Sequence, residues 1–544
     1  MIGKDYLFSD IGIDAIGFSA PRYYVDIEEL AEKRNVDPAK YRKGLLLKEM
    51  RISDVDEDII SIGLKAGYNA LERGKINPRE IDAIFVGTET MTYAVKSVAN
   101  IFAQLLDVSS SCLTQDVYNA CAGGTLAVLN AIGLIERGVI NKALVISADI
   151  SSYPIKSPSE PTQGCGAVAL VITKYPRVAR FGKEFGKVSG NVNDFWRAPG
   201  DKNAHVFGHY SLDSYLQLQL EAYDNLIDNM GENFYADYYA FHAPFSKMPL
   251  KCIRNIIEKR WVYNMGDLLK LQEGTTLADK LFNTFDSFLQ DISVLPEYIY
   301  LNLKERGLSS KKLEKLSNFV VSNVKHRILP HLSVPMHFGN LYNGSIWSQV
   351  QFLAENCVKE NDIIYFGSYG SGATAIAGLL KVCKGFQEVI EQPPTIKDFI
   401  DFKERISVEE YEKIKKGKKK PKRYIARIAE LEELNENRGF TLNFCNEGCI
   451  IPNIDTVNHC PQEHSGFHER RFPLYAKLAS EPQPINSKDY SYLKDGWVRV
   501  EKGVTEDDIL EYSIRRVELK NNDLVEQGLL NWSPYYQKCL KWSK

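Results

Sequence analysis

Short apolar runs, rich in β-branched and aromatic residues, alternate with longer amphipathic stretches through residues 1–390. This alternation is typical of an α/β protein, in which strands and helices follow one another along the chain. The runs predicted to form buried strands are 81–87, 115–120, 142–150 and 166–172. Helical spacing over 98–106 and 124–136 places helices between these strands, and Arg137-Gly138 ends the second helix. The apolar residues expected on one side of that second helix are Leu126, Leu129, Ile132 and Ile135.

A second set of elements follows with a similar order. Apolar runs at 237–244 and 362–372 predict strands, a Gly/Asn-rich segment occupies 339–345, and 373–382 (ATAIAGLLKV) is expected to be a helix. Because a strand that ends in a polar residue precedes a helix and a further strand in both halves, we predict a duplicated α/β core. The stretch 250–335, rich in Leu, Lys and Glu at helical spacing, predicts helices packed on the second half.

Composition narrows the class of protein. The 544 residues include 67 Lys and Arg against 70 Asp and Glu, and 44% are hydrophobic, as in an ordinary soluble globular protein. A nucleic-acid-coating protein and a largely disordered chain are disfavoured. No apolar run is long enough to span a membrane and no export signal opens the chain, so we expect a cytoplasmic protein with its ten cysteines mostly reduced. The basic segment 413–423 predicts a solvated loop, with polyanion binding as the alternative.

Three reactive side chains lie at the ends of predicted strands. Cys121 falls between the strand 115–120 and the next helix, where the partial positive charge and free N–H groups favour a thiolate and can hold an oxyanion. Taken alone, a cysteine is more often a small apolar filler of the core. Glu89 follows the strand 81–87 and is a candidate base with a raised pKa, and His242 repeats this arrangement in the second half. Together the three residues predict an active site.

Short sequence blocks follow one another in a distinctive order. They are GTET (87–90), NACAGGTLA (119–127), SADISSY (147–153), EPTQGCGAVALVI (160–172), NDFWRAPG (193–200), FHAPFSKM (241–248), GNLYNGS (339–345), SYGSG (368–372) and GFHERRFPLYAKL (466–478). On these blocks the chain resembles the 3-hydroxy-3-methylglutaryl-CoA synthase family of the thiolase superfamily. The resemblance implies an α/β fold with a thiolase-like duplicated five-layered α/β/α/β/α core and a C-terminal extension.

The same resemblance suggests four parts of the chain. They are an N-terminal half (1–175), a C-terminal half with a helical insert (176–395), a basic loop with the family's C-terminal strand region (396–480), and an extension (481–544) of unknown role. From its mixed aromatic and charged sequence, the extension is expected to form strands and a terminal helix.

The resemblance also implies roles for individual residues. Cys121 is expected to be the nucleophile that acetyl-CoA acylates, Glu89 the base that deprotonates the acetyl methyl, and His242 the group that binds the acetoacetyl carbonyl. Further residues implied to bind substrate or support the acyl pocket are Asp149, Tyr153, Thr162, Asp194, Phe195, Ser211, Lys247, Lys251, Asn340 and Ser371. Of these, Lys247, Lys251 and Ser211 match contacts to CoA.

The implied reaction condenses acetyl-CoA with acetoacetyl-CoA and water to 3-hydroxy-3-methylglutaryl-CoA and CoA, in the mevalonate route to isoprenoids. It needs no metal or redox cofactor, and CoA thioesters are its only small-molecule partners. The family implies a homodimer and allows a complex with a thiolase, and neither nucleic acid nor a membrane is expected as a partner. Val206-Phe207-Gly208 departs from the family's usual Val-Asp-Gly, from which we expect altered tuning and not lost activity.

Three alternatives remain open. The same condensation could act on acyl-carrier-protein substrates in polyketide β-branching, although Lys247 and the NDFWRAPG block favour free CoA. The chain could also be a non-catalytic scaffold, against which the retention of all three reactive residues argues. A thiolase or ketosynthase would not need the Glu89 block. Separately, four residues near the C-terminus could form a zinc site, with loosely clustered reduced side chains as the alternative: Cys445, Cys449, Cys460 and His464.

Overall fold

The computed structural model describes residues 5–256 except 56, 94, 199–202, 233 and 235, then residues 309 and 327–418, and short strands between 440 and 526. These residues belong to two compact units. The first comprises residues 1–103 and 109–412, and the second comprises 104–108 and 413–544. Apart from residues 104–108, both halves of the predicted duplicated core therefore lie in the first unit.

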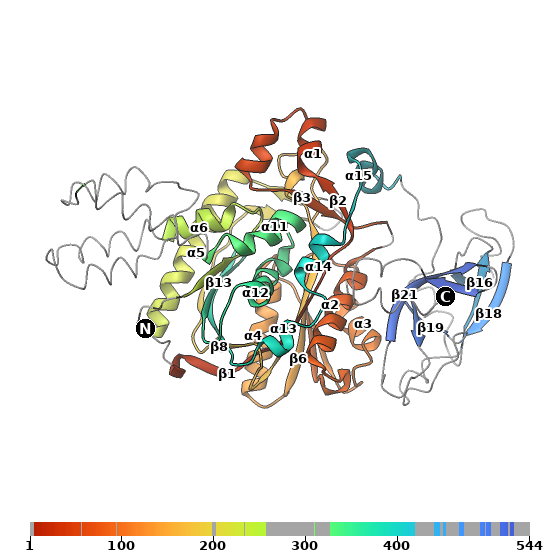
Figure 1. Ribbon diagram of the computed structural model, residues 1–544, viewed down its shortest axis with the longest axis horizontal. Coiled ribbons are helices and arrows are strands. Elements are labelled where there is room, and N and C mark those ends of the chain that lie inside the picture. The colour runs from red at the N-terminus through yellow and green to blue at the C-terminus, as the bar shows by residue number, and fades with distance from the viewer. Residues whose placement is uncertain are drawn as a thin grey trace. The chain divides into compact units, whose positions relative to one another are not determined.

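A ten-stranded mixed sheet forms the centre of the first unit (Figure 1). Its hydrogen-bonded order is β12-β13-β14-β8-β1-β7-β6-β4-β5, with β9 paired to β14. The strands are β1 (Phe8–Ser19), β4 (Ala83–Gly87), β5 (Leu113–Val117), β6 (Lys142–Ile150), β7 (Cys165–Lys174), β8 (Ala179–Gly182), β9 (Gly186–Ser189), β12 (Tyr238–Phe241), β13 (Ile363–Gly370) and β14 (Thr374–Val382). Strand β1 joins the two halves because it pairs with β7 on one side and β8 on the other.

The two halves share one local arrangement. Strand β4 runs parallel to β6, with Gly87 opposite Ser147, and the chain then continues to Glu89. Strand β12 runs parallel to β13, with Phe241 opposite Gly367, and His242 follows directly. Each strand pair thus ends in one of the predicted reactive residues, and the predicted thiolase-like α/β class is confirmed.

Helices cover the sheet and form its core contacts. Helix α2 (Ile59–Gly74) packs on β1, β6 and β7, while α5 (Gly208–Met230) packs on β9, β13 and β14. Helix α4 (Gly123–Glu136) lies against β4 and β6, and α12 (Ser345–Asn356) contacts both β1 and β13. Further described helices and strands are β2 (Tyr23–Asp26), α1 (Ile27–Lys33), β3 (Glu49–Ile52), α3 (Val98–Leu105), β10 (Phe195–Trp196), β11 (His205–Val206), α6 (Met248–Ile256), α11 (Ser333–Phe338), α13 (Gln387–Ile390), α14 (Ile396–Asp401), β15 (Glu404–Arg405) and α15 (Val408–Lys415).

Helix α4 approaches β4 closely, and this sets the position of Cys121. A Cβ atom added at Gly87 would lie only 2.3 Å from the backbone nitrogen of Gly124. The spacing of β4 and α4 therefore leaves no room for a side chain at position 87. The buried side of α4 accordingly carries the small residues Ala127 and Ala131. The residues predicted on one side of this helix differ in burial: Ile135 is buried, whereas Leu126, Leu129 and Ile132 are only partly buried.

Two predicted elements also differ in kind. Residues 374–382 form strand β14 and not the expected helix, because this run is buried along both faces between β13 and its other neighbours. An apolar run of this length does not distinguish a buried helix from a buried strand. The strand predicted at 115–120 begins earlier, as β5, and is not buried: it ends the sheet order, and Leu113 is 45% exposed.

The predicted helical insert lies largely outside the described residues. Its described parts are α6, which packs on α5 and β12, and α11 with residues 327–332 before it. Residues 257–308 and 310–326 fall outside the described part of the chain.

The second unit contains two small antiparallel sheets, ordered β17-β16-β18 and β19-β20-β21-β22. Their strands are β16 (Phe440–Cys445), β17 (Ile450–Pro452), β18 (Phe467–Phe472), β19 (Tyr490–Lys494), β20 (Trp497–Glu501), β21 (Tyr512–Lys520) and β22 (Asp523–Glu526). The strands expected in the extension are therefore present. The expected terminal helix and the zinc candidates Cys449, Cys460 and His464 lie outside the described residues, and only the backbone of Cys445 is described.

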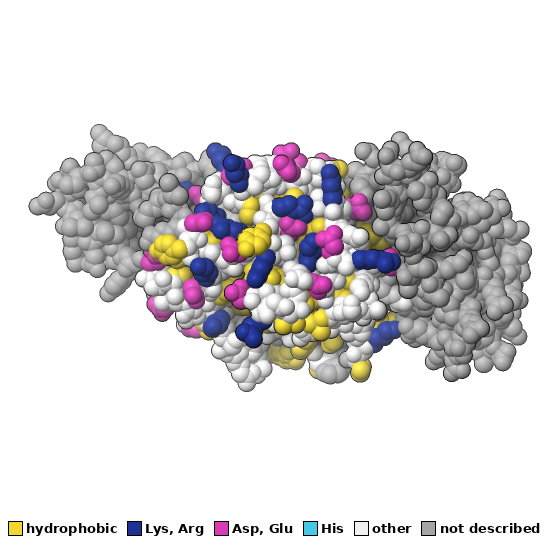
Figure 2. All heavy atoms as spheres, turned by 90° about the horizontal axis from the view of Figure 1, so that it is seen from below, with side chains coloured by type: hydrophobic (Ala, Val, Ile, Leu, Met, Phe, Trp, Pro, Cys, Tyr) yellow, Lys and Arg dark blue, Asp and Glu magenta, His cyan; other side chains and the backbone are white. Residues whose placement is uncertain are grey.

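Charges of both signs share the surface of the first unit. On the face seen in Figure 2, Lys and Arg side chains are interspersed with Asp and Glu side chains over the described residues. Of the helices that the structure describes, none has the length and apolar character needed to cross a membrane.

Candidate active site

Cys121 and Glu89 are in direct contact. The Sγ atom of Cys121 donates a hydrogen bond to Oε1 of Glu89 at 2.7 Å. Cys121 lies between β5 and α4, as predicted, and Glu89 follows β4 by two residues. The structure therefore brings together a thiol and a carboxyl that are 32 residues apart in the sequence.

The surroundings of Cys121 and Glu89 favour the protonated form of each side chain. Burial, and then the negative charge of Glu89, raise the pKa of the Cys121 thiol well above its ordinary value. Burial and the nearby Asp149 raise the pKa of Glu89 to about 8, against smaller opposing effects of Cys121 and Arg197. The thiolate predicted at this helix terminus stays a prediction; in the substrate-free protein, burial and the charge of Glu89 favour the protonated thiol.

The N–H groups at the start of α4 are already paired. Those of Ala122 and Gly123 donate to the carbonyl oxygens of Asn119 and Ala120, and that of Gly124 donates to Oδ1 of Asn343 at 2.7 Å. The prediction that free N–H groups here hold an oxyanion was therefore wrong for these three residues.

Asp149 holds the surroundings of Cys121 and Glu89 in place through buried hydrogen bonds. Its buried carboxylate accepts hydrogen bonds from the backbone N–H of Glu89 at 2.9 Å and from both the backbone and side chain of Asn343, at 3.0 and 2.9 Å. Thr88 and Thr90 also donate to it. One carboxylate thus holds the end of β4 and the segment after α11, although it does not line the cavity described below.

His242 lies at the end of β12 with its backbone fixed on both sides. Its N–H donates to the carbonyl oxygen of Gly367 at 2.8 Å, and its own carbonyl oxygen accepts from the hydroxyl of Tyr215 at 2.7 Å. The side chain is buried, and burial lowers its pKa to about 3. The imidazole is therefore neutral near pH 7.

A cavity of about 720 Å³ connects the thiol and the imidazole. Cys121 and His242 both line the cavity. Glu89 is not among the lining residues but accepts the hydrogen bond from Cys121. The predicted binding residues that line the cavity are Tyr153, Thr162, Phe195, Ser211, Asn340 and Ser371. Cys121, Tyr153 and Tyr342 form a small buried cluster at its base.

Asp194 supports the opposite wall and, like Asp149, is not part of the lining. Its fully buried carboxylate accepts hydrogen bonds from Ser211 and Ser371, both at 3.0 Å, and from Tyr369 at 3.1 Å. Helix α5 and the end of β13 are thereby joined. The role predicted for the two acidic residues, support of the pocket, agrees with this geometry.

Lys247 and Lys251 lie beside the cavity and not in its lining. Lys247 donates through Nζ to the carbonyl oxygen of Lys43 at 3.3 Å, and the ammonium group of Lys251 is 5.5 Å from the ring centre of Phe245. Phe245 itself lines the cavity. Both lysines are thus near its rim, where their contact with CoA stays a prediction.

Sequence reasoning missed several residues of the site. Asn343 and Tyr342 occur in the GNLYNGS block but were not singled out, although they hold α4 and line the cavity respectively. Arg197 donates to the carbonyl oxygen of Glu89 at 2.6 Å. Its position in the NDFWRAPG block was the only available signal. Among the described residues, no group of three or more His, Cys, Asp or Glu side chains is placed to hold a metal ion.

The duplicated α/β fold, with a cysteine at a helix terminus and a histidine at the matching end of the other half, defines a condensing enzyme of the thiolase-like class. Models of the hydroxymethylglutaryl-coenzyme A synthase N-terminal and C-terminal domains match residues 8–176 and 190–448. The chain belongs to the hydroxymethylglutaryl-CoA synthase family.

Curated relatives agree with this family. A hydroxymethylglutaryl-CoA synthase of Enterococcus faecalis is 29% identical over 407 residues, which cover 74% of this chain and 90% of the relative. A hydroxymethylglutaryl-CoA synthase of Gibberella zeae is 30% identical over 392 residues, which cover 67% and 81% of the two chains.

Solved structures show the same fold. MvaS in complex with 3-hydroxy-3-methylglutaryl-CoA matches with a TM-score of 0.61 and 28% identity, over 75% of this chain and 91% of the other. An HMG-CoA synthase complexed with CoA matches with a TM-score of 0.59 and 26% identity, over 74% and 89% of the two chains. The chain is accordingly an acyl-CoA condensing enzyme of the acyltransferase class.

Proposed function

We propose that this enzyme condenses acetyl-CoA with acetoacetyl-CoA and water to form 3-hydroxy-3-methylglutaryl-CoA and CoA, through an acetyl group on Cys121. The observation that carries the proposal is the 2.7 Å hydrogen bond from the Cys121 thiol to Glu89, on a cavity that His242 also lines. The cytoplasm and the mevalonate route to isoprenoids are the proposed setting.

The contact between Cys121 and Glu89 suits the first two steps. The sulfur of Cys121 attacks the acetyl-CoA carbonyl, the thiol proton passes to the departing CoA sulfur so that CoA leaves as its thiol, and an acetyl thioester remains on Cys121. Glu89, whose pKa is raised to about 8 and whose ionised form is therefore a stronger base than an ordinary carboxylate, then removes a proton from the acetyl methyl group. The resulting enolate is the carbon nucleophile of the condensation.

His242 suits the second substrate. A neutral imidazole can donate a hydrogen bond to the ketone oxygen of acetoacetyl-CoA and stabilise the alkoxide that forms when the enolate attacks. Burial lowers the pKa of His242 to about 3, so the donor is the neutral ring. Protonation of the alkoxide and hydrolysis of the Cys121 thioester by water then release the product and restore the thiol.

Free CoA thioesters are the proposed substrates. Lys247 and Lys251 lie beside Phe245 and the cavity rim, where they would meet the phosphates of CoA. An HMG synthase of the curacin biosynthetic pathway in complex with acetyl donor-ACP also has this fold, with a TM-score of 0.60, but at 22% identity that likeness concerns the fold alone.

A homodimer is the proposed assembly. Strand β5 ends the sheet order of the described strands and leaves a hydrogen-bonding edge open. Leu113 within β5 and Tyr118 directly after it are 45% and 72% exposed. An open edge flanked by apolar side chains suits pairing with a second copy.

The test is product formation by the purified full chain. Mass spectrometry should detect 3-hydroxy-3-methylglutaryl-CoA when both acetyl-CoA and acetoacetyl-CoA are supplied, and Cys121→Ala should abolish it while Cys112→Ala retains it. Product from the Cys121→Ala protein, or none from the folded wild type, would contradict the proposal.

A further inference from the structure

One loop forms a continuous wall of the cavity. The loop 151–164 is closed at its base, where the N–H of Ser151 donates to the carbonyl oxygen of Gly164 at 2.9 Å and the N–H of Gly164 donates to Oγ of Ser151 at 2.7 Å. Its residues that line the cavity are Tyr153, Pro154, Ser157, Pro158, Ser159 and Thr162. The shape of the acyl pocket therefore depends on the conformation of this loop.

Two buried side chains fix the loop from within. Oε1 of Gln163 accepts a hydrogen bond from the backbone N–H of Tyr153 at 2.8 Å, and Oε2 of Glu160 accepts one from the N–H of Lys156 at 2.8 Å. Gln163 and Glu160 are 3% and 1% exposed. They can hold the backbone only while their remaining polar atoms are also satisfied.

Residues from two distant elements supply those remaining partners. The hydroxyl of Tyr411, in α15, donates to Oε1 of Glu160 at 3.0 Å and accepts from Nε2 of Gln163 at 2.8 Å. Arg34, which follows α1, donates to the two oxygens of Glu160 from Nε and Nη2 at 2.7 and 2.8 Å. A buried chain of hydrogen bonds thus runs from Tyr411 through Gln163 to the backbone of Tyr153, beside Cys121.

We propose that Tyr411 and Arg34 are positioning residues of the acyl pocket, acting through Gln163 and Glu160 on the wall loop 151–164. The expected effect on the reaction rate rests on the proposed function. The hydrogen bonds that connect Tyr411 and Arg34 with the loop do not depend on the reaction. Without the Tyr411 hydroxyl, Gln163 and Glu160 each lose a buried partner, and the side chains must move to find others. A shift of about 1 Å in a pocket wall can lower a rate up to a hundredfold.

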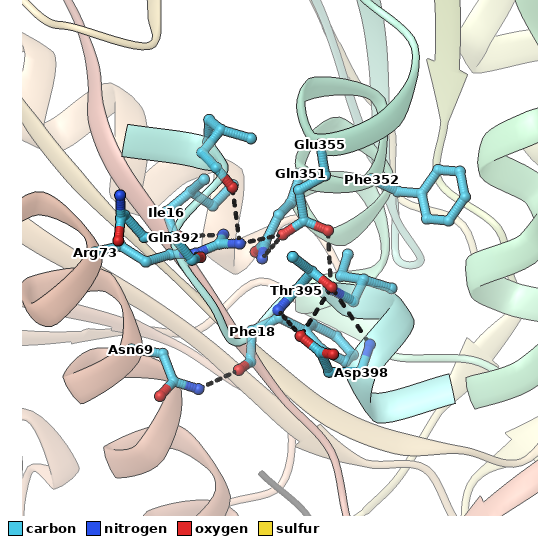
Figure 3. A network of polar contacts seen from close by, with 12 residues as sticks. Ile16, Phe18, Asn69, Arg73, Gln351, Phe352, Glu355, Gln392, Thr395 and Asp398 are labelled. Carbon is cyan, nitrogen blue, oxygen red and sulfur yellow. Dashed lines mark hydrogen bonds and ion pairs between the residues drawn. The ribbon is translucent and has the colours of Figure 1, made fainter. Parts of the chain in front are cut away.

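A second buried ion pair provides a matched comparison. Nη2 of Arg73 lies 2.7 Å from Oε1 of Glu355, and both side chains are at most 2% exposed. Arg34 and Glu160 are equally close, with side chains that are 6% and 1% exposed. Figure 3 shows that the pair of Arg73 and Glu355 joins α2 and α12. Glu355 also accepts a hydrogen bond from the backbone N–H of Ile396 at 2.8 Å. The partners of Arg73 and Glu355 drawn in Figure 3 do not include the wall loop 151–164. This ion pair therefore stabilises the same unit without fixing the pocket.

The experiment compares Tyr411→Phe and Glu160→Gln with Glu355→Gln in the full chain. Deuterium uptake by peptides that cover residues 151–164 is expected to become about three- to tenfold faster in the first two variants and to stay unchanged in Glu355→Gln. The value of kcat/KM, per active site and well below the unfolding temperature, should fall about tenfold or more in the first two only. Melting temperatures are expected to fall in Glu160→Gln and Glu355→Gln alike.

Two results would overturn the proposal. One is unchanged exchange of 151–164 in Tyr411→Phe, and the other is an equal loss of kcat/KM in Glu355→Gln, which would indicate general destabilisation. Should Glu160→Gln fail to fold, Tyr411→Phe alone decides, since it keeps the ring and removes only the hydroxyl. If the wild type makes no product, the proposed function fails, and the exchange measurement still decides whether Tyr411 fixes the loop.

Discussion

The carboxylate of Asp149 accepts a hydrogen bond from the backbone N–H of Glu89 at 2.9 Å. Because the same carboxylate accepts from Asn343, which in turn accepts from the N–H of Gly124, a single buried group connects the base with the helix that follows Cys121. The negative charge of Asp149 is also a cause of the raised pKa of Glu89. Asp149 therefore affects both the geometry and the ionisation of the candidate base.

Replacing Asp149 with Asn should lower kcat and move the pH profile. The amide cannot accept all of the hydrogen bonds that the carboxylate accepts, so Glu89 shifts and kcat falls about tenfold or more. Loss of the negative charge lowers the pKa of Glu89, so the acidic limb of the kcat/KM profile moves to lower pH. The measurement is steady-state kinetics from pH 5 to 9. Asp116→Asn, which alters the carboxylate that caps α3, is the control and should leave the limb in place.

Replacing Glu89 with Gln should stabilise the fold at alkaline pH. The pKa of Glu89 is raised from 4.5 to about 8 on folding, so the folded state binds the proton more strongly than the unfolded chain does. The contribution of Glu89 to the free energy of unfolding is most favourable below pH 4.5 and is lost as pH rises toward 8. The melting temperature of Glu89→Gln relative to wild type should therefore increase between pH 5 and 9. A difference that stays constant over this range would mean that the pKa of Glu89 is not raised.

Glu89→Ala should accept an acetyl group but fail to condense it. The charge of Glu89 is one cause of the raised pKa of Cys121, so its removal favours the thiolate, whereas the enolate step loses its base. Intact mass after incubation with acetyl-CoA, followed by a product assay, separates the two steps. Product formation within tenfold of wild type would rule out Glu89 as the base.

The Lys247→Ala and Lys251→Ala variants test the carrier of the acyl group. A hydrogen bond to a charged phosphate contributes roughly 1.5 to 3 kcal/mol before solvent screening reduces it, so KM for acetoacetyl-CoA should rise about tenfold with kcat nearly unchanged. Lys183→Ala, at an exposed position outside the cavity lining, is the control. An unchanged KM together with a strong preference for acyl-carrier-protein substrates would favour the polyketide alternative.

The positions of Glu89 and His242 were predictable because each follows an apolar run that forms a strand of the sheet. Strand β14 was not, since its residues are buried along both faces and carry no alternation of apolar and polar positions. The small residues on the buried side of α4 were also not predicted. There the close approach of Gly87 and Gly124 favours small side chains over larger apolar ones.

The support of the site could not be predicted from spacing. Asp149 contacts Glu89, 60 residues away, and Asn343, 194 residues away, and no local pattern marks such a carboxylate. The same holds for Tyr411, whose partner Glu160 is 251 residues distant. Desolvation of Cys121, which raises the pKa of its thiol, was likewise invisible in the sequence.

The central claim is that Cys121 carries the acyl group, and the most direct test maps the site of acetylation. The full chain is incubated with acetyl-CoA alone, quenched at low pH, and analysed by intact mass and peptide mapping. One acetyl group per chain is expected on the peptide that contains Cys121, with none in Cys121→Ala and an unchanged amount in Cys112→Ala. Acetyl label that maps to Cys112, or that persists in Cys121→Ala, would contradict the account.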